Sequence, residues 1–445
     1  MSTGKCRHVG ATTRSAPGRW GWRVVAALML IVPLLASQGS RVADAQDAAG
    51  PLRIGALFPF TGDLSDFGPG FLNAAELAVN EINAGGGVNG QPVELVQGDT
   101  ATSPQQAVEE ARRLIELEGV PAIIGPAGSG EALPVVESVA GPAGVLVISP
   151  SATSPALSVA NDNDFFFRLP ISDAAQGVVM ADVAGEQGYQ SACVMYVNNA
   201  YGQGLSDAFA ESFTAQGGTI TAQVPHEQEQ ASYASELAAC TEGDPDALIG
   251  AAYPESGRVF LRELVEGGDA PSIVFSDGLK STDLFAELGW EPFSGNYGTA
   301  SGAPETESGA AFEAAWEAAY GELPPLPYLK EVYDAVYVIS LAAEQSDSVD
   351  AGAIRDALRE VANDPGTVII PGTEGWQTAV AAIDAGEDVD YEGASGTVEF
   401  DENGDITQGV IEVWQVEGEE IISVETREVD LSAGAAATPE ATPTA

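Results

Sequence analysis

The stretch Gly125-Pro-Ala-Gly128-Ser129-Gly130 has the residue types of a ligand-binding loop. It follows an apolar run that we predict to be a short buried strand, and it precedes residues predicted to begin a helix. Glycine lets the backbone come close to a bound group. The first N–H groups of a helix favour an anion, and Ser129 would add a hydroxyl group. The stretch therefore predicts an anion-binding loop, with a ligand-free tight turn as the alternative.

The same stretch is typical neither of a phosphate site nor of a hydrolase. It lacks the lysine of a GxxxxGK[ST] phosphate loop, and residue 127 is Ala, so the GxSxG nucleophile motif is absent. Only two histidines occur, His8 and His226. A Ser-His-Asp or Cys-His enzyme would depend on His226, which lies in a polar stretch that we expect to be a surface loop. We therefore expect no catalytic residues, no metal and no cofactor.

The chain is strongly acidic, with 66 Asp and Glu against 17 Lys and Arg and a formal net charge of −49. Nucleic acid and anionic membrane surfaces are poor partners for such a surface. Because the charge is scattered, it indicates a solvated shell over a folded protein, and it is also compatible with a saline habitat. The 445 residues suffice for two or more domains with their own cores.

The first 45 residues are typical of an export signal. Arg14, Arg19 and Arg23 precede an apolar run at 24–36, and a small-residue site, Ala43-Asp-Ala45, follows it. The run is too short to span a bilayer comfortably. We therefore expect cleavage after residue 45 and a soluble exported protein, with a retained N-terminal anchor as the alternative.

Cys193 and Cys240 are the only cysteines beyond that signal. Exported thiols tend to be paired. Cys193 falls in a predicted strand, and Cys240 ends a predicted helix just before another strand of the same sheet. We predict a disulfide between them, and buried free thiols are the alternative.

Strands and helices alternate along most of the chain. This alternation argues for an α/β fold with parallel sheets and helices on both faces. The stretch 165–170 breaks the rhythm and is interpreted as a crossing to a second domain. Strands are predicted at 52–58, 93–96, 120–124, 145–148, 192–197, 247–251 and 273–275.

The C-terminal third begins with a predicted return crossing at 296–302, followed by helices at 308–320, 329–345 and 350–361. A hairpin is predicted to join 395–400 to 410–415. Asp401, Asn403 and Asp405 lie between its arms. They lack the glycine placement and distal Glu of a calcium-binding EF-hand loop, so a plain turn is favoured.

Several stretches of the chain together carry a resemblance to one known family. They are 54–62 with Phe67-Gly68, 74–90, 124–129, 148–153, 167–168 and 201–204. These stretches resemble the branched-chain amino-acid binding proteins of ABC importers, the Leu/Ile/Val-binding group of type I solute-binding proteins, and the resemblance covers about residues 52–425. It implies two lobes joined by three crossing strands, with one ligand in the cleft between them.

The resemblance also implies a division into domains. We expect a signal peptide at 1–45 and a disordered tail at 431–445. The first lobe would comprise 52–170 and 299–390, and the second 171–298 and 391–430.

In the first lobe, the resemblance assigns Ser129 and Thr153 to the α-carboxylate of the ligand, with backbone groups around Gly128 and Ser151 helping. Such donors agree with the chemistry of the glycine-rich stretch. Phe67 corresponds to an aromatic residue near the ligand side chain.

In the second lobe, Tyr201 and Tyr253 correspond to loop residues that close over the ligand. Asp277 falls where an acidic residue pairs with the α-ammonium. Tyr253 precedes Pro254 and could instead simply pack, and Asp277 could instead cap the helix after it.

Two departures leave the ligand open. No Cys lies between 46 and 192 to form the first-lobe disulfide of the family, and Asp277 is shorter than the Glu common at its position. An amide, urea or an aromatic acid is therefore an alternative to an amino acid.

The leading hypothesis is a monomeric, non-catalytic protein outside the cell membrane, in the periplasm or at the extracellular face. It would deliver an amino acid, branched-chain or similar, to ABC permease subunits. A sensory protein of the same fold is the second hypothesis. An amidase is the third, and the shortage of histidine disfavours it.

Overall fold

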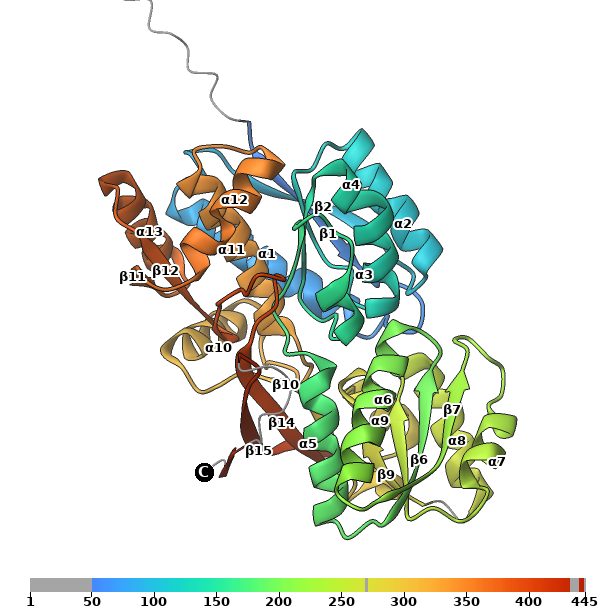
Figure 1. Ribbon diagram of the computed structural model, residues 1–445. Coiled ribbons are helices and arrows are strands. Elements are labelled where there is room, and N and C mark those ends of the chain that lie inside the picture. Colours follow the sequence, from blue (N-terminus) through green and yellow to red (C-terminus); the bar gives the residue numbers. More distant parts are fainter. Residues whose placement is uncertain (1–49, 269–270, 433–439, 444–445) are drawn as a thin grey trace, which may run out of the picture. The chain divides into compact units, whose positions relative to one another are not determined.

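The computed structural model describes residues 50–268, 271–432 and 440–443 (Figure 1). The predicted signal peptide and most of the predicted tail lie outside these residues. Within the part of the chain that is described, no helix is long and apolar enough to cross a membrane.

The first sheet is entirely parallel and has the strand order β2-β1-β3-β4-β5. Its strands are β1 (Leu52–Phe58), β2 (Val93–Asp99), β3 (Ala122–Ile124), β4 (Leu146–Ser149) and β5 (Phe166–Arg168). The connecting helices are α1 (Gly68–Gly85), α2 (Pro104–Arg112), α3 (Ser129–Val135) and α4 (Gly141–Ala143), with π-helical segments at Arg113–Leu117 and Val136–Ala140 and a 3-10 turn at Pro155–Val159. We call this sheet and the helices packed on it the first lobe.

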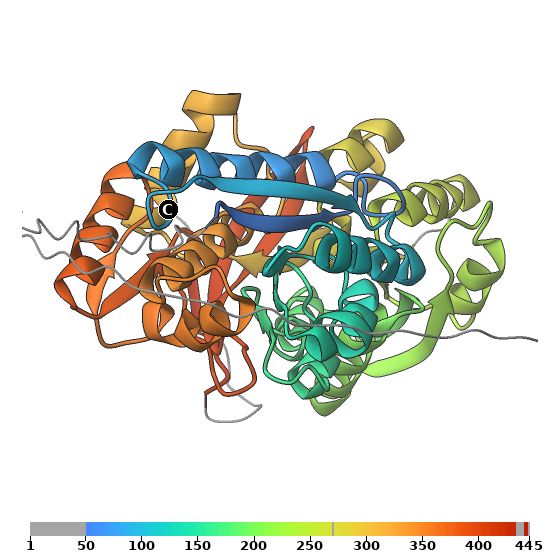
Figure 2. The same cartoon turned by 90° about the horizontal axis from the view of Figure 1, so that it is seen from above.

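Four later helices return to the first lobe. They are α10 (Glu307–Tyr320), α11 (Leu329–Gln345), α12 (Ala351–Ala362) and α13 (Thr373–Ala385). Helices α10, α11 and α13 pack on α1, and α12 packs on α11; Figure 2 shows the orange helices beside the blue one. A small sheet of β11 (Thr367–Ile369), β12 (Val389–Gly393) and β13 (Gly396–Thr397) accompanies them.

The second sheet has the strand order β16-β15-β14-β10-β9-β8-β6-β7. Strands β6 to β10 are parallel, whereas β14 and β15 are antiparallel additions. The strands are β6 (Ser191–Val197), β7 (Thr219–His226), β8 (Ala247–Ala251), β9 (Ser272–Phe275), β10 (Tyr297–Gly302), β14 (Gln408–Glu417), β15 (Glu420–Asp430) and β16 (Glu440–Pro443). β16 pairs with β15, where we expected an irregular tail.

Helices cover both faces of the second sheet, and together they form the second lobe. They are α5 (Asp173–Glu186), α6 (Ala200–Ala215), α7 (Ala234–Thr241), α8 (Pro254–Gly267) and α9 (Thr282–Leu288), with 3-10 turns at Asp277–Leu279 and Glu291–Phe293. The predicted fold class, two mainly parallel sheets with helices on both faces, is confirmed.

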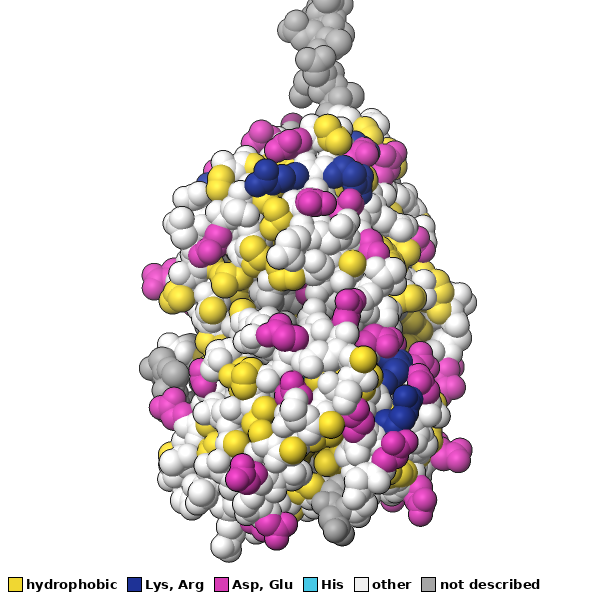
Figure 3. All heavy atoms as spheres, turned by 90° about the vertical axis from the view of Figure 1, so that its right-hand side faces the viewer, with side chains coloured by type: hydrophobic (Ala, Val, Ile, Leu, Met, Phe, Trp, Pro, Cys, Tyr) yellow, Lys and Arg dark blue, Asp and Glu magenta, His cyan; other side chains and the backbone are white. Residues whose placement is uncertain are grey.

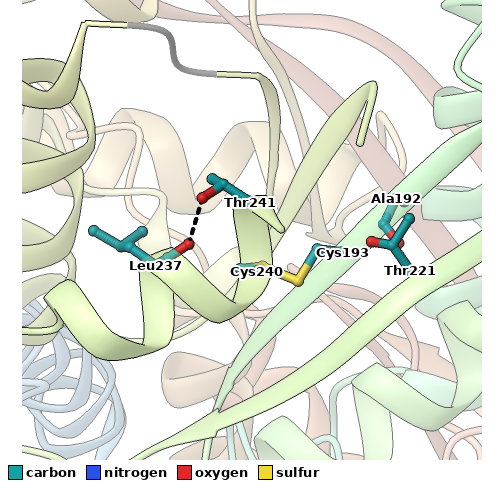
Figure 4. Close-up of a disulfide and its surroundings, with 6 residues drawn as sticks. All are labelled: Ala192, Cys193, Thr221, Leu237, Cys240 and Thr241. Carbon is teal, nitrogen blue, oxygen red and sulfur yellow. Dashed lines mark hydrogen bonds between the residues drawn. A yellow bond between two sulfur atoms is a disulfide. The ribbon is translucent and has the colours of Figure 1, made fainter. Parts of the chain in front are cut away.

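A disulfide in the second lobe links Cys193 on β6 to Cys240 at the end of α7, with the two Cα atoms 5.4 Å apart (Figure 4). Both side chains lie in a buried cluster with Met195, Leu237 and Leu248. The bond therefore ties α7 to β6, the strand next to the β7 edge of the sheet.

His226 was wrongly predicted to be a surface residue. It ends β7 with only 2% of its surface exposed, and its ring packs 5.1 Å from the ring of Tyr233 and 6.0 Å from that of Phe260. Burial lowers the pKa of the imidazole. The residue is therefore part of the core.

The segment after β13 also differs from the prediction. Strand β14 pairs with β10 and β15, so the predicted hairpin between 395–400 and 410–415 is wrong. The turn containing Asp401 and Asp405 instead reaches the fully buried Arg168, whose guanidinium donates to both oxygens of Asp405 at 2.6 and 2.9 Å. The acidic turn thus neutralises a buried arginine at the end of β5.

Candidate functional site

A cavity lies where the two lobes face each other. Its walls come from loops at the C-terminal ends of β3, β4, β6, β8 and β9, which is where parallel sheets hold ligands. Most of the predicted site residues meet there. The lining residues are Leu64, Phe67, Phe71, Ala127, Gly128, Ser129, Ser151 and Tyr328 from the first lobe, and Tyr201, Tyr253, Asp277 and Gly278 from the second.

The glycine-rich loop forms part of the first-lobe wall. A Cβ at residue 128 would lie 2.5 Å from an oxygen of the Glu131 side chain, which would have to shift to make room for it. The hydroxyl of Ser129 accepts a hydrogen bond from the Ser154 N–H at 3.1 Å, and that of Ser151 donates to the Ala127 carbonyl at 3.0 Å. The loop is thus held rigidly against the loop that follows β4.

Thr153 is the predicted residue that does not line the cavity. It is fully buried, and its hydroxyl has no hydrogen-bond partner among the described residues. Its carbonyl accepts a hydrogen bond from the Asp173 N–H at 2.9 Å. The structure therefore places Thr153 beside the start of α5.

Two stacked tyrosines form the second-lobe wall. The rings of Tyr201 and Tyr253 lie 5.4 Å apart and are inclined by only 11°. Asn199 links them, because its side chain caps the N–H groups of Tyr201 and Gly202 and donates to the Tyr253 hydroxyl at 3.0 Å. Tyr253 thus belongs to a hydrogen-bonded wall as well as to the packing.

Asp277 is the centre of the hydrogen-bond network in the cavity. Its carboxylate accepts hydrogen bonds from Tyr201 at 2.7 Å, Gln176 at 2.9 Å and Tyr328 at 2.8 Å. Helix α9 is capped by Ser281, so the alternative role of Asp277 as a helix cap is excluded. Burial raises the pKa of Asp277, and the three donors oppose that rise.

A second carboxylate, missed from the sequence, lies behind the first. Asp173 is fully buried at the start of α5, and neither of its oxygens has a hydrogen-bond partner among the described residues. Burial, and then the negative charge of Asp277, hold its pKa well above the ordinary value. Two such carboxylates without a cation between them form a place for a positive charge.

Tyr328 is a second site residue that was not predicted from the sequence. It precedes α11 in a left-handed conformation, with φ 72°, and its hydroxyl joins Asp277 across the two lobes. Such a backbone is costly for a non-glycine residue and often marks a functional site. The only sequence signal was the proline-rich run 324–327 just before it.

The remaining wall is apolar. Leu64, Phe67 and Phe71 are buried, and the rings of the two phenylalanines meet edge to face at 5.8 Å. The site therefore offers neutral donors, carboxylates and an apolar surface. In the described part of the chain, no group of three or more His, Cys, Asp and Glu is arranged to hold a metal ion.

The cavity is small in this conformation, about 20 Å³. That volume accommodates little more than one water molecule. An amino acid therefore requires the lobes to move apart before it can enter.

The sequence model described as periplasmic binding protein matches residues 51–418. The chain is 31% identical to the chemotactic signal transduction system substrate-binding protein BasB of Halobacterium salinarum, over 79% of this chain and 84% of BasB. It is 29% identical to the Leu/Ile/Val-binding protein BraC3 of Rhizobium johnstonii, over 75% and 90% of the two chains. The leucine-binding protein LivK of Thermotoga maritima is similar in structure, with a TM-score of 0.72, 25% identity and coverage of 85% and 99%.

Proposed function

We propose that this chain, which belongs to the periplasmic binding protein family, captures an amino acid with an apolar side chain and delivers it to the permease of an ABC importer. As a member of a family of binding proteins, the chain is not an enzyme. The observation that carries the proposal is the position of Asp277 in the wall of the cavity, together with the neutral donors of the first lobe, with the buried Asp173 behind it.

A zwitterion needs a partner of each charge in one cavity. The ligand ammonium would face Asp277, with the buried carboxyl group of Asp173 behind it. Its carboxylate would face the hydroxyl of Ser129 and the N–H groups that follow Gly128, which suit an anion. The side chain would lie against Leu64, Phe67 and Phe71. Each end of the cavity thus complements one part of an apolar amino acid.

A sensory role is the second candidate. BasB, whose name describes a chemotactic substrate-binding protein, is 31% identical to this chain over 361 residues. A sensory protein would bind the same ligand but present its closed form to a signalling partner. Deleting the gene separates the two roles, because loss of uptake supports the importer and loss of taxis alone supports the sensor.

The ligand is tested with protein purified from its native host. Mass spectrometry of the molecule released on denaturation should identify an amino acid, and calorimetry should show binding of Leu, Ile or Val. Acetamide, urea and benzoate are the matched alternatives, since they lack the ammonium, the carboxylate or both. Binding of one of these in place of every amino acid would overturn the proposal.

The proposal also predicts where the protein is located in the cell and whether it is a monomer. A protein that serves a permease from outside acts as an exported monomer. Fractionation of the native cells and light scattering of the purified protein measure both properties.

A further inference from the structure

A second and larger cavity lies at the connections between the lobes. Its volume is about 500 Å³, within the range of ordinary ligand pockets. All three connections contribute to its wall: Ile171 lies between β5 and α5, Pro304 follows β10, and Val398 follows β13. The antiparallel strands β14 and β15 close another side (Figure 1).

One buried carboxylate lines this cavity with a single, long hydrogen bond from another side chain. Glu331 on α11 is only 4% exposed, and the one hydrogen bond to its carboxylate comes from Ser301 at the long distance of 3.5 Å. Lys330, next to it in the chain, is bonded instead to Glu313 at 2.7 Å. Burial raises the pKa of Glu331 to about 8.

The neighbouring carboxylate of Asp334, in contrast, accepts several short hydrogen bonds. Its two oxygens accept hydrogen bonds from the Tyr391 hydroxyl, the Ala394 N–H, and the N–H and hydroxyl of Ser395, at 2.6 to 2.8 Å. Asp334 thus anchors the third connection. Glu331, one turn earlier on the same helix, has no such anchoring role.

The other lining residues indicate which kind of molecule this cavity binds. Leu169, Ile171 and Val410 supply buried apolar surface. Two further carboxylates, those of Glu428 and Asp430, lie on the wall, and no Lys, Arg or His is among the described lining residues. A molecule that fits must carry a positive charge and an apolar body.

We propose that this cavity is a second binding site, for a small organic amine whose ammonium group faces Glu331 and whose hydrocarbon part lies against Leu169 and Val410. The site is separate from the cavity that holds Asp277. Since the occupant touches all three connections, it stabilises the present arrangement of the lobes.

The probe is hexylamine, with 1-hexanol as the neutral control of the same length. Binding to the full protein is followed by ligand-observed NMR and calorimetry. We expect hexylamine to bind one to one and hexanol to bind more weakly. Glu331→Gln should weaken hexylamine by about tenfold, the loss of roughly one well-placed charge interaction, while Asp277→Asn should leave its affinity unchanged.

One further variant and one control measurement complete the test. Thr397→Trp places a bulky side chain at an exposed position on the wall and should also abolish hexylamine binding. Amino-acid binding by Glu331→Gln shows that this variant is folded. The inference is overturned if hexylamine does not bind, if Glu331→Gln and Thr397→Trp bind it as the wild type does, or if Asp277→Asn loses it. None of these outcomes alters amino-acid binding in the first cavity, so the proposed function is tested separately.

Discussion

Arg258 on α8 of the second lobe donates two hydrogen bonds, of 2.9 and 2.8 Å, to the carboxylate of Asp66 in the first lobe. The side chains are only 11% and 10% exposed. Ser281 donates to the same carboxylate. Because Asp66 immediately precedes Phe67 in the wall of the amino-acid cavity, this largely buried ion pair joins the lobes beside the ligand.

We expect Arg258→Met to weaken amino-acid binding by about tenfold, because the closed arrangement loses a charge-assisted contact between the lobes. Arg262→Met is the matched control: Arg262 lies on the same helix, but its ion pair is with Glu287 of the same lobe. Calorimetry at several salt concentrations measures both. Equal losses in the two variants, or none in Arg258→Met, would contradict the role of this pair.

Neutralising Asp277, the proposed partner of the ligand ammonium, should reduce the free energy of binding more than removing the hydroxyl of Ser129, a proposed donor to the ligand carboxylate. Asp277→Asn leaves a desolvated cation short of its counter-charge and should cost about 2–5 kcal/mol of binding. Ser129→Ala should cost about 1–2 kcal/mol, because backbone N–H groups still hold the carboxylate. Calorimetry with the native ligand measures the loss of binding in both variants. If Asp277→Asn binds normally while Ser129→Ala fails, the ligand has no amine at Asp277.

Glu131 makes the stability of the protein depend on pH. It is 1% exposed, one of its oxygens has no partner among the described residues, and burial, with Asp99 adding to it, raises its pKa from about 4.5 to about 8. A raised folded-state pKa gives stability that is fully present below 4.5 and is lost as the pH rises through 8. The free energy of unfolding should therefore fall across this window, by up to about 1.4 kcal/mol per pH unit.

Urea unfolding between pH 5 and 9 measures this dependence. Glu131→Gln should flatten the profile. Glu137→Gln is the control, since Glu137 lies in the same helical run but is exposed. An unchanged slope in Glu131→Gln would show that the residue is ionised in the folded state.

Much of the fold and part of the site could be predicted, because both depend on local pattern. Apolar runs alternating with helical periodicity define the strands of parallel sheets, and polar loops follow β3 in the first sheet and β6 and β9 in the second. Ser129, Tyr201 and Asp277 follow these three strands, and they meet in one cavity because the strand ends of both lobes line it. The acid residues are scattered over the face in Figure 3, as the composition predicted.

The errors come from contacts between residues distant in the sequence. Nothing near His226 indicates that Tyr233 and Phe260 cover it. The local sequence does not distinguish Asp173 from any other acidic residue in the first turn of a helix. Only the fold places it beside Asp277. Tyr328 approaches the site because α11 packs on α1, again a tertiary relationship.

The disulfide should stabilise the second lobe without affecting the ligand. It spans 47 residues between Cys193 and Cys240, and a cross-link of this kind is worth about 2–5 kcal/mol. The double variant Cys193→Ala, Cys240→Ala should lose about this much free energy of unfolding and keep its amino-acid affinity. Thiol labelling of unfolded, unreduced wild type is the complementary test, and two reactive cysteines would show that no bond forms in the cell.

The lobes should move apart in the absence of ligand. The cavity, of about 20 Å³ in the present conformation, must widen before an amino acid enters, and its walls come from both lobes. A ligand that touches both walls stabilises the closed form by its greater affinity for it. Small-angle scattering should therefore show a smaller radius of gyration with saturating amino acid. Asp277→Asn is the control, because at the same concentration of amino acid it should stay open. A wild-type radius that does not change on saturation would mean that the ligand enters without movement of the lobes.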